Sequence, residues 1–349
     1  MSLPDTVALL VEAGACAPSA DNSQPWRFRW AQQQLSLLNG DERAAGATFP
    51  RDHPATYMAM GAAIENMLQA ARSTSIELEA STQNAGGEFC VIRILSDGVA
   101  LGKARQIPLF QRCTNRLPYK TIKISKAILD GIVAPTTSEN ARIIVLDRDS
   151  EIAEAARLVR SASEVRFQTK EIHEWFSSSL RFSQTEVEAG DGLDVSTFYM
   201  PPGGRYFLQF IRDWRRMERL NKIGAYKFLS RIEAATVAKA PLLLAIVGSP
   251  GLDAALAAGQ LMERTWIELN RQGLAVQPYY VLSDQLQRLA DGCVPPHLVD
   301  QIRALGRETQ QLLALGDNIV YILLRVGYPY RSPVRSRRLP LHQVISENS

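Results

Sequence analysis

Two arginine-rich segments contain the residue types that bind phosphate groups. In the first, Arg112 and Arg116 stand on either side of Thr114. The second lies near the C-terminal end and comprises Arg335, Arg337 and Arg338. A guanidinium binds phosphate through a planar fork of charge-assisted hydrogen bonds, and a threonine hydroxyl adds one more donor. The alternative is an ordinary solvated basic surface, and these residues alone favour that alternative.

The chain lacks the common signatures of catalytic side chains. It contains no GxGxxG, GxxxxGK(S/T), HExxH or GxSxG. The four histidines are scattered, and each is expected to be an ordinary surface or core residue. The four cysteines form no CxxC, which argues against zinc and against a disulfide framework and favours a reduced, cytoplasmic protein. If the protein is an enzyme, we expect its chemistry on a bound cofactor, with no metal and no catalytic side chain.

Composition excludes several classes of protein. The 349 residues are 46% apolar and 21% charged, which excludes a disordered tail, a collagen and a coiled coil. One large domain or two ordinary ones would fit. A net charge of +3 is too small to indicate nucleic acid. The longest aliphatic stretch, 242–247, is far short of the ~20 residues of a membrane helix, and no Lys or Arg precedes Arg27, so no secretory signal is expected.

Apolar periodicity predicts the elements that must position these residues. Helices are predicted at 5–15, 57–72, 124–132, 150–163 and 252–271, with Gly273 ending the last one. Strands are predicted at 26–30, 34–39, 76–79, 89–95, 142–146, 242–247 and 319–326. Between about 178 and 232 the pattern is irregular and rich in glycine and proline, which is typical of a lid or a binding element.

Two segments in the first half of the chain align with two segments in the second half. Placing Gly61 on Gly259 pairs Glu65 with Glu263 within two central, mostly apolar helices. The same comparison places residues 17–22 on residues 134–140, each just before a strand. Because the two matches agree in order, we interpret them as a duplication, although amphipathic helices also align by chance.

Four segments carry a resemblance to a known family. Residues 17–26, APSADNSQPW, resemble the APSxxNxQPW loop of the FMN-dependent nitroreductase superfamily. Residues 112–116, RCTNR, resemble its RxSxR phosphate motif, with Thr114 in place of serine. Residues 273–278, GLAVQP, resemble its GLxxxP segment beside the flavin, and 325–329 with 337–341 resemble its C-terminal strand and basic end. The similarity runs from about residue 8 to 343, and only the first motif is specific by itself.

The resemblance implies a role for each segment. Arg112, Thr114 and Arg116 would bind the FMN phosphate, with Arg337 and Arg338 completing the site and Arg335 a weaker candidate. Pro18, Ser19, Asn22 and Gln24 would meet the pyrimidine edge of the flavin, where donors stabilise the negative charge of the reduced ring. Backbone groups of Pro278, Tyr279 and Tyr280 would line the N5 side. The alternatives are a turn residue for Asn22, a core residue for Trp26 and an ordinary strand entry for 278–280, while Asp21 is expected to face solvent or cap a turn.

In that family one subunit supplies the loop and its partner the phosphate motif. Here each motif occurs once in good form, in different halves of the chain, and the second-half loop around Ala134, Pro135 and Thr136 is degenerate. The resemblance therefore implies the twin-domain subgroup, a fused pseudo-dimer similar to Acg-type and ThiF-associated nitroreductase-like proteins, with one intact flavin site and one decayed site.

The predicted fold class is α+β, with two tandem nitroreductase-like repeats whose central, mostly antiparallel sheets are flanked by helices. The repeats are residues 1–103 and 104–349, the second with an insertion or lid at about 178–232 and a C-terminal extension. Within the insertion, Tyr199, Met200, Arg205 and Tyr206 are predicted to cover a planar substrate, or to form a flap that only shields the flavin. The basic stretch from Arg212 to Lys222 is predicted to be one face of a solvated helix.

The function implied is that of an FMN-dependent NAD(P)H oxidoreductase, which passes hydride through flavin N5 to a nitroaromatic, a quinone or an oxidised heterocycle. One alternative is a protein that sequesters FMN or binds a partner without turnover. A third is a reductase or dehydrogenase acting beside a carrier or adenylating enzyme. The expected partner is a small-molecule substrate, with no nucleic acid and no membrane. The expected assembly is a monomer that mimics a homodimer, and further association is left open.

Overall fold

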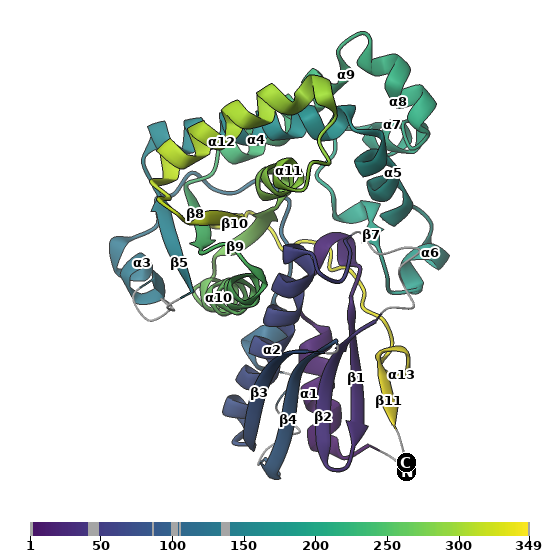
Figure 1. Ribbon diagram of the computed structural model, residues 1–349, viewed down its shortest axis with the longest axis vertical. Coiled ribbons are helices and arrows are strands. Elements are labelled where there is room, and N and C mark those ends of the chain that lie inside the picture. Colours follow the sequence, from purple (N-terminus) through teal and green to yellow (C-terminus); the bar gives the residue numbers. More distant parts are fainter. Residues whose placement is uncertain are drawn as a thin grey trace.

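The computed structural model describes residues 3–40, 49–85, 87–98, 104, 106–133 and 140–347. It confirms the α+β class, with two mostly antiparallel sheets flanked by helices (Figure 1). The first sheet has the order β11-β1-β2-β4-β3. Its strands are β1 (Trp26–Ala31), β2 (Gln34–Asn39), β3 (Glu77–Ala85), β4 (Glu88–Ser96) and β11 (Ile345–Glu347).

The second sheet repeats the strand order of the first. Its order is β5-β8-β10-β9, and every neighbouring pair is antiparallel, as in β1-β2-β4-β3. The strands are β5 (Ala141–Leu146), β8 (Leu242–Gly248), β9 (Ala275–Tyr279) and β10 (Ile319–Gly327). A helix precedes each sheet, and a central helix follows the second strand of each. These helices are α1 (Asp5–Ala15), α2 (Pro54–Thr74), α3 (Lys126–Val133) and α10 (Leu252–Arg271). Both halves thus share one topology.

The two central helices, α2 and α10, cross at two glycines. A Cβ on Gly61 would lie 2.0 Å from the carbonyl oxygen of Leu256, and a Cβ on Gly259 would lie 2.1 Å from that of Met58. The alignment that pairs Gly61 with Gly259 also pairs Met58 with Leu256. Placing one repeat on the other therefore interchanges these two contacts, as expected when a local two-fold axis relates the helices.

The second sheet is covered on both faces. Leu242, Leu244 and Ile246 of β8 belong to a core shared with α2 and α10, whereas Leu243 and Ala245 pack into a separate core on the other face. Figure 1 shows α10 on one side of this sheet and the helices α4 (Asp149–Gln168), α11 (Val281–Ala290) and α12 (Val299–Leu313) on the other. Because both faces are apolar, every residue of β8 is buried.

The segment between β5 and β8 has no counterpart in the first half, where a short turn joins β1 to β2. It is longer than the insertion predicted at about 178–232, and it is mostly helical. Besides α4 it contains α5 (Lys170–Ser179), β6 (Leu180–Arg181), α6 (Gln184–Glu188), β7 (Leu193–Asp194), η6 (Val195–Thr197), α7 (Gly204–Phe210), α8 (Trp214–Asn221) and α9 (Ala225–Ala238). Gly203 and Gly224 take left-handed backbone (φ 83° and 91°) just before α7 and α9. Such breaks leave helices too short for a long periodic pattern.

The C-terminal extension returns to the first half. After β10, residues 328–340 run back toward α1, followed by α13 (Leu341–Val344) and β11, which pairs in parallel with β1. Along the part of the chain that the structure describes, no helix combines the length and apolarity needed to span a membrane.

Candidate functional site

The predicted flavin loop joins α1 to β1 and contains the short helix η1 (Ala20–Asn22). Asp21, Asn22 and Gln24 all have positive φ, between 49° and 57°. Aspartate and asparagine tolerate this region, but glutamine rarely adopts it, so surrounding contacts must hold the loop in place. One such contact is the backbone N–H of Gln24, which donates to Ser19 Oγ at 3.0 Å.

The amides of Asn22 and Gln24 bind two distant segments. Asn22 Nδ2 donates to the carbonyl oxygens of Gly192 (2.9 Å) and Arg337 (3.0 Å). Gln24 Nε2 donates to the carbonyl oxygen of Gly190 at 2.8 Å, and its Oε1 accepts from the N–H of Leu339 at 3.0 Å. Both side chains are buried. The hydrogen bonds of these two amides therefore clamp the loop between the insertion and the C-terminal extension.

Arginines from the second half reach the same loop. Arg112 Nη2 donates to the carbonyl oxygen of Cys16 at 2.6 Å. Arg338 donates to Asn22 Oδ1 at 2.7 Å and to the carbonyl oxygen of Ala17 at 3.0 Å. The side chain of Arg337 is exposed, and its contribution is the carbonyl oxygen that Asn22 binds. The loop and both basic segments thus come together.

Arg116 is the predicted phosphate ligand whose guanidinium keeps several unused N–H donors. Its Nη1 donates to Thr197 Oγ1 at 3.2 Å, and its guanidinium lies over the ring of Phe198, 5.0 Å from the centroid. Burial lowers its pKa, while the charge of Asp21 raises it. Among described residues, no carboxylate lies within 4.0 Å of this guanidinium. Since arginine carries five N–H donors, Arg116 keeps several for an anion.

Arg112 instead forms an ion pair with a buried acid on α10. Its Nε lies 2.8 Å from Glu263 Oε1, its guanidinium lies over the ring of Trp266, and both charged side chains are almost fully buried. Burial raises the pKa of Glu263 to about 7, although Arg112 and Asn66 lower it. Glu65, the repeat equivalent of Glu263, is also fully buried and is paired with Arg264 at 2.8 Å.

We expect Glu263 to make the protein more stable at mildly acidic pH. Because its pKa rises from an ordinary 4.5 to about 7 on folding, the folded state holds the extra proton between these values. The free energy of unfolding therefore falls as pH rises through this window. Urea unfolding of Glu263→Gln across the same window is expected to show a shallower slope than the parent. Burial also raises the pKa of Asp284 to about 6, but this residue contributes equally to the slopes of the parent and the variant, so its effect cancels in the comparison. Equal slopes for the two proteins would contradict a raised pKa at Glu263.

The strand β9 and the turn after it hold the third predicted group. Tyr279 is buried with its hydroxyl 2.5 Å from that of Thr236, and Pro278 is partly buried in β9. The ring of Tyr280 meets that of Phe49 edge to face, with centroids 5.5 Å apart. His53, stacked on Phe49 at 4.2 Å, was not singled out from the sequence; burial lowers its pKa to about 4. These aromatic residues lie in separate segments, so no regular spacing in the sequence indicates that their rings pack together.

Four predicted residues take other positions. Thr114 forms an isolated β-bridge with Val276. Tyr199 and Tyr206 are 55% and 76% exposed rather than packed over the loop. Arg205 donates to the carbonyl oxygen of Phe182 within the insertion. Residues 190–198 of the insertion make the hydrogen bonds to the loop and to Arg116. The remaining predicted residues, Pro18, Ser19 and Met200, are partly buried, and residues 134–139 lie outside the described part of the chain.

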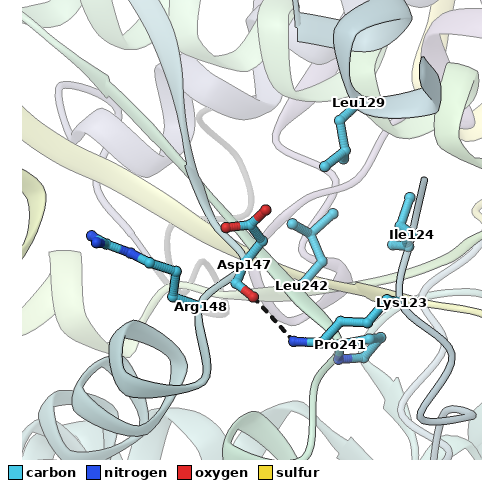
Figure 2. Close-up of a pocket in the computed structure, with 7 residues that line it drawn as sticks. All are labelled: Lys123, Ile124, Leu129, Asp147, Arg148, Pro241 and Leu242. Carbon is cyan, nitrogen blue, oxygen red and sulfur yellow. Dashed lines mark hydrogen bonds between the residues drawn. The ribbon is translucent and has the colours of Figure 1, made fainter. Parts of the chain in front are cut away.

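Two hollows in the surface lie away from these residues. One, of about 330 Å³, lies between the start of α3 and the ends of β5 and β8. Figure 2 shows Lys123 beside the Asp147 carbonyl oxygen, to which its Nζ donates at 3.2 Å. The other lies on the polar outer face of the first sheet and includes Arg29 and Glu88, an ion pair at 3.2 Å. No group of metal-binding side chains occurs among the residues that the structure places.

Comparison with known proteins gives a distant relative and no family model. The chain is 24% identical over 350 residues to "Uncharacterized protein MT1398" of Mycobacterium tuberculosis (strain CDC 1551 / Oshkosh), covering 97% of this chain and 48% of the relative. The chain thus spans about half the length of the curated relative it matches.

Solved structures with partial likeness include two nitroreductases. One is a nitroreductase with bound FMN from Bacteroides fragilis, at 11% identity and a TM-score of 0.37, covering 67% of this chain and 92% of that one. Another is the FMN and NADPH-dependent nitroreductase NfnB from sphigopyxis sp. strain HMH, at 16% identity and a TM-score of 0.36, covering 69% and 97%. Likenesses at this level do not establish a family, so the function must be argued from the chain's own residues.

Proposed function

We propose that the protein is an FMN-dependent oxidoreductase of nitroreductase type, built as a fused pseudo-dimer. The observation that supports it most is the contact between the loop of the first half and the arginines of the second. Arg112 lies 2.6 Å from the Cys16 carbonyl oxygen, and Arg338 lies 2.7 Å from Asn22 Oδ1. A flavin site shared by two halves requires this juxtaposition. The shared strand order and the reciprocal glycine contacts support repeats at 1–103 and 104–349, with the lid in 178–232.

The phosphate end of the site fits FMN. Arg116 would bind the phosphate with its remaining donors, and Thr114, on the same segment, would add a hydroxyl. Arg112 would act indirectly, because its buried guanidinium is ion-paired with Glu263 and its Nη2 donates to the Cys16 carbonyl oxygen. Arg338 and the clamp at Asn22 would hold the loop in register with Arg116.

The flavin, when bound, would supply the hydride acceptor between NAD(P)H and a small planar substrate. The chain's part is to bind and orient it. At the ring end, Asn22 and Gln24 already bind the carbonyls of Gly190 and Gly192. Their amides reach the pyrimidine edge only if residues 190–192 withdraw; otherwise backbone groups of the loop make that contact.

A second function is favoured by the same clamp. If residues 190–198 stay over the loop, nicotinamide and substrate are excluded, and the protein would hold FMN without turnover. Anaerobic stopped-flow mixing of the FMN-loaded protein with NADPH and with NADH separates the two functions. Rapid bleaching of the flavin absorbance supports the oxidoreductase, and no bleaching supports sequestration. Purified protein that shows no flavin absorbance and takes up no FMN contradicts both.

Replacing Arg116 by alanine is expected to weaken FMN binding by about 1.5–3 kcal/mol, because a charge-assisted phosphate contact is lost. Fluorescence titration with FMN measures the dissociation constant. Arg215→Ala, an exposed position on α8, is the matched control and should leave the constant unchanged. An unchanged constant for Arg116→Ala would remove this residue from the site.

A further inference from the structure

The insertion concentrates exposed apolar side chains. Of the eleven large apolar side chains that are exposed in the described part of the chain, seven lie between residues 199 and 232. Ile223 is 83% exposed, Tyr206 76% and Phe228 61%. A scattered exposed residue needs no explanation, but a cluster of this kind marks an interaction surface.

The helices present these residues as stripes. On α7, Tyr206 and Phe210 are four residues apart and lie on one side. On α9, Phe228 and Ile232 have the same spacing, while Ser230, Ala234 and Val237 are buried on another side of the helix. Figure 1 shows α7, α8 and α9 together at one corner of the molecule, away from both sheets. We call the exposed residues of 199–232 the insertion surface.

The same surface carries an excess of unpaired positive charge. Residues 199–232 contain eight arginines and lysines but only two acidic residues, although the whole chain has a net charge of only +3. The eight are all exposed: Arg205, Arg212, Arg215, Arg216, Arg219, Lys222, Lys227 and Arg231. Among described residues, none of them lies within 4.0 Å of a carboxylate. Arg216 lies over the ring of Phe210, 4.8 Å from its centroid, so charges and rings share one surface.

We propose that the insertion surface binds the surface of an anionic phospholipid bilayer. Basic residues attract anionic headgroups, while neighbouring aromatic and aliphatic side chains enter the boundary between headgroups and acyl chains. This is peripheral binding, which needs no spanning helix, and it departs from the expectation, drawn from the sequence, of no membrane partner. It does not depend on the proposed flavin chemistry.

Two features favour lipid over other anionic partners. Ile223 and Ile232 are aliphatic, so they cannot stack on nucleobases as the aromatic platforms of nucleic-acid proteins do. A peptide helix would need an apolar groove, whereas Tyr206 and Phe210 on α7 and Phe228 and Ile232 on α9 are exposed side chains. Outward-facing stripes on adjacent helices instead match a broad, deformable layer.

Co-sedimentation with vesicles tests the proposal on the full chain. We expect binding to vesicles of phosphatidylcholine mixed with phosphatidylglycerol, little binding to phosphatidylcholine alone, and weaker binding at high salt. The triple variant Arg215→Glu, Arg216→Glu, Arg219→Glu should lower the partition coefficient about a hundredfold. The double variant Ile223→Ser, Phe228→Ser should lower it about tenfold or more, with unchanged net charge.

A charge-matched control keeps the test specific. Lys126→Glu, Arg303→Glu, Arg307→Glu changes three exposed basic residues outside the insertion and should retain most of the binding. Equal loss in both triple variants, or no binding to anionic vesicles at low salt, would overturn the proposal. So would tight binding of a single-stranded oligonucleotide without vesicle binding, which indicates nucleic acid. Self-association by light scattering, abolished by the serine variant and without vesicle binding, would indicate a second copy instead. Circular dichroism checks that each variant is folded.

Discussion

Replacement of Arg112 by methionine is expected to lower the free energy of unfolding by about 3–5 kcal/mol. The substitution leaves the Glu263 carboxylate buried without its ion-pair partner, and the Cys16 carbonyl oxygen keeps only the longer hydrogen bond from Arg338 at 3.4 Å. Because a protonated Glu263 needs no counter-ion, the loss should be larger at pH 8 than at mildly acidic pH. Urea unfolding at both pH values measures the effect.

The controls for Arg112 use an exposed pair and a double variant. Arg303→Met removes the exposed pair with Asp300, which should cost less than about 1 kcal/mol. Arg112→Met combined with Glu263→Leu should recover much of the lost stability, since no buried charge remains. A loss below about 1 kcal/mol for Arg112→Met alone would contradict a buried ion pair.

Replacing either crossing glycine, Gly61 or Gly259, by alanine is expected to destabilise the protein by about 3 kcal/mol, at the upper end of the cost of overpacking. In each case the new Cβ meets a backbone carbonyl oxygen near 2 Å, and backbone cannot rotate away as a side chain can. The helices must separate or tilt, even though alanine is the better helix former by about 1 kcal/mol.

Gly131→Ala on α3 is the matched control, because a Cβ there meets nothing within 4 Å. It should be neutral or stabilising by about 0.5–1 kcal/mol. Thermal or urea unfolding distinguishes the three variants. Similar losses for Gly61→Ala and Gly259→Ala are expected from the local two-fold relation, whereas a loss confined to one would contradict equivalent packing.

Regular elements of this fold are predictable from local pattern. The helix at 252–271 and the first helix at 5–15 match the structure at both ends, because apolar spacing and the flanking Gly273 mark them. The helix predicted at 57–72 begins earlier, at Pro54, since the His53 side chain caps it by accepting from the N–H of Ala55 at 3.1 Å. A histidine cap carries little signal in a single sequence.

The site is predictable only in part. Resemblance to a family loop was sufficient to predict that residues 17–26 and Arg112 belong to one site, because a shared motif implies a shared arrangement. Nothing in the sequence indicated that Gly190 and Gly192 would occupy the amides of Asn22 and Gln24. Those contacts use backbone carbonyls, which every residue has, so side-chain identity does not encode them.

The parallel pairing of β11 with β1 has a consequence for synthesis. Phe28 of β1 pairs with Ile345, which leaves the ribosome about 300 residues later, or roughly 15–60 s at 5–20 residues per second. Until then one edge of the nascent first sheet has free backbone donors and acceptors, open to pairing with another chain. Slower translation should therefore lengthen the time in which this edge is open to aggregation, and a chaperone that covers it should raise the yield of native protein.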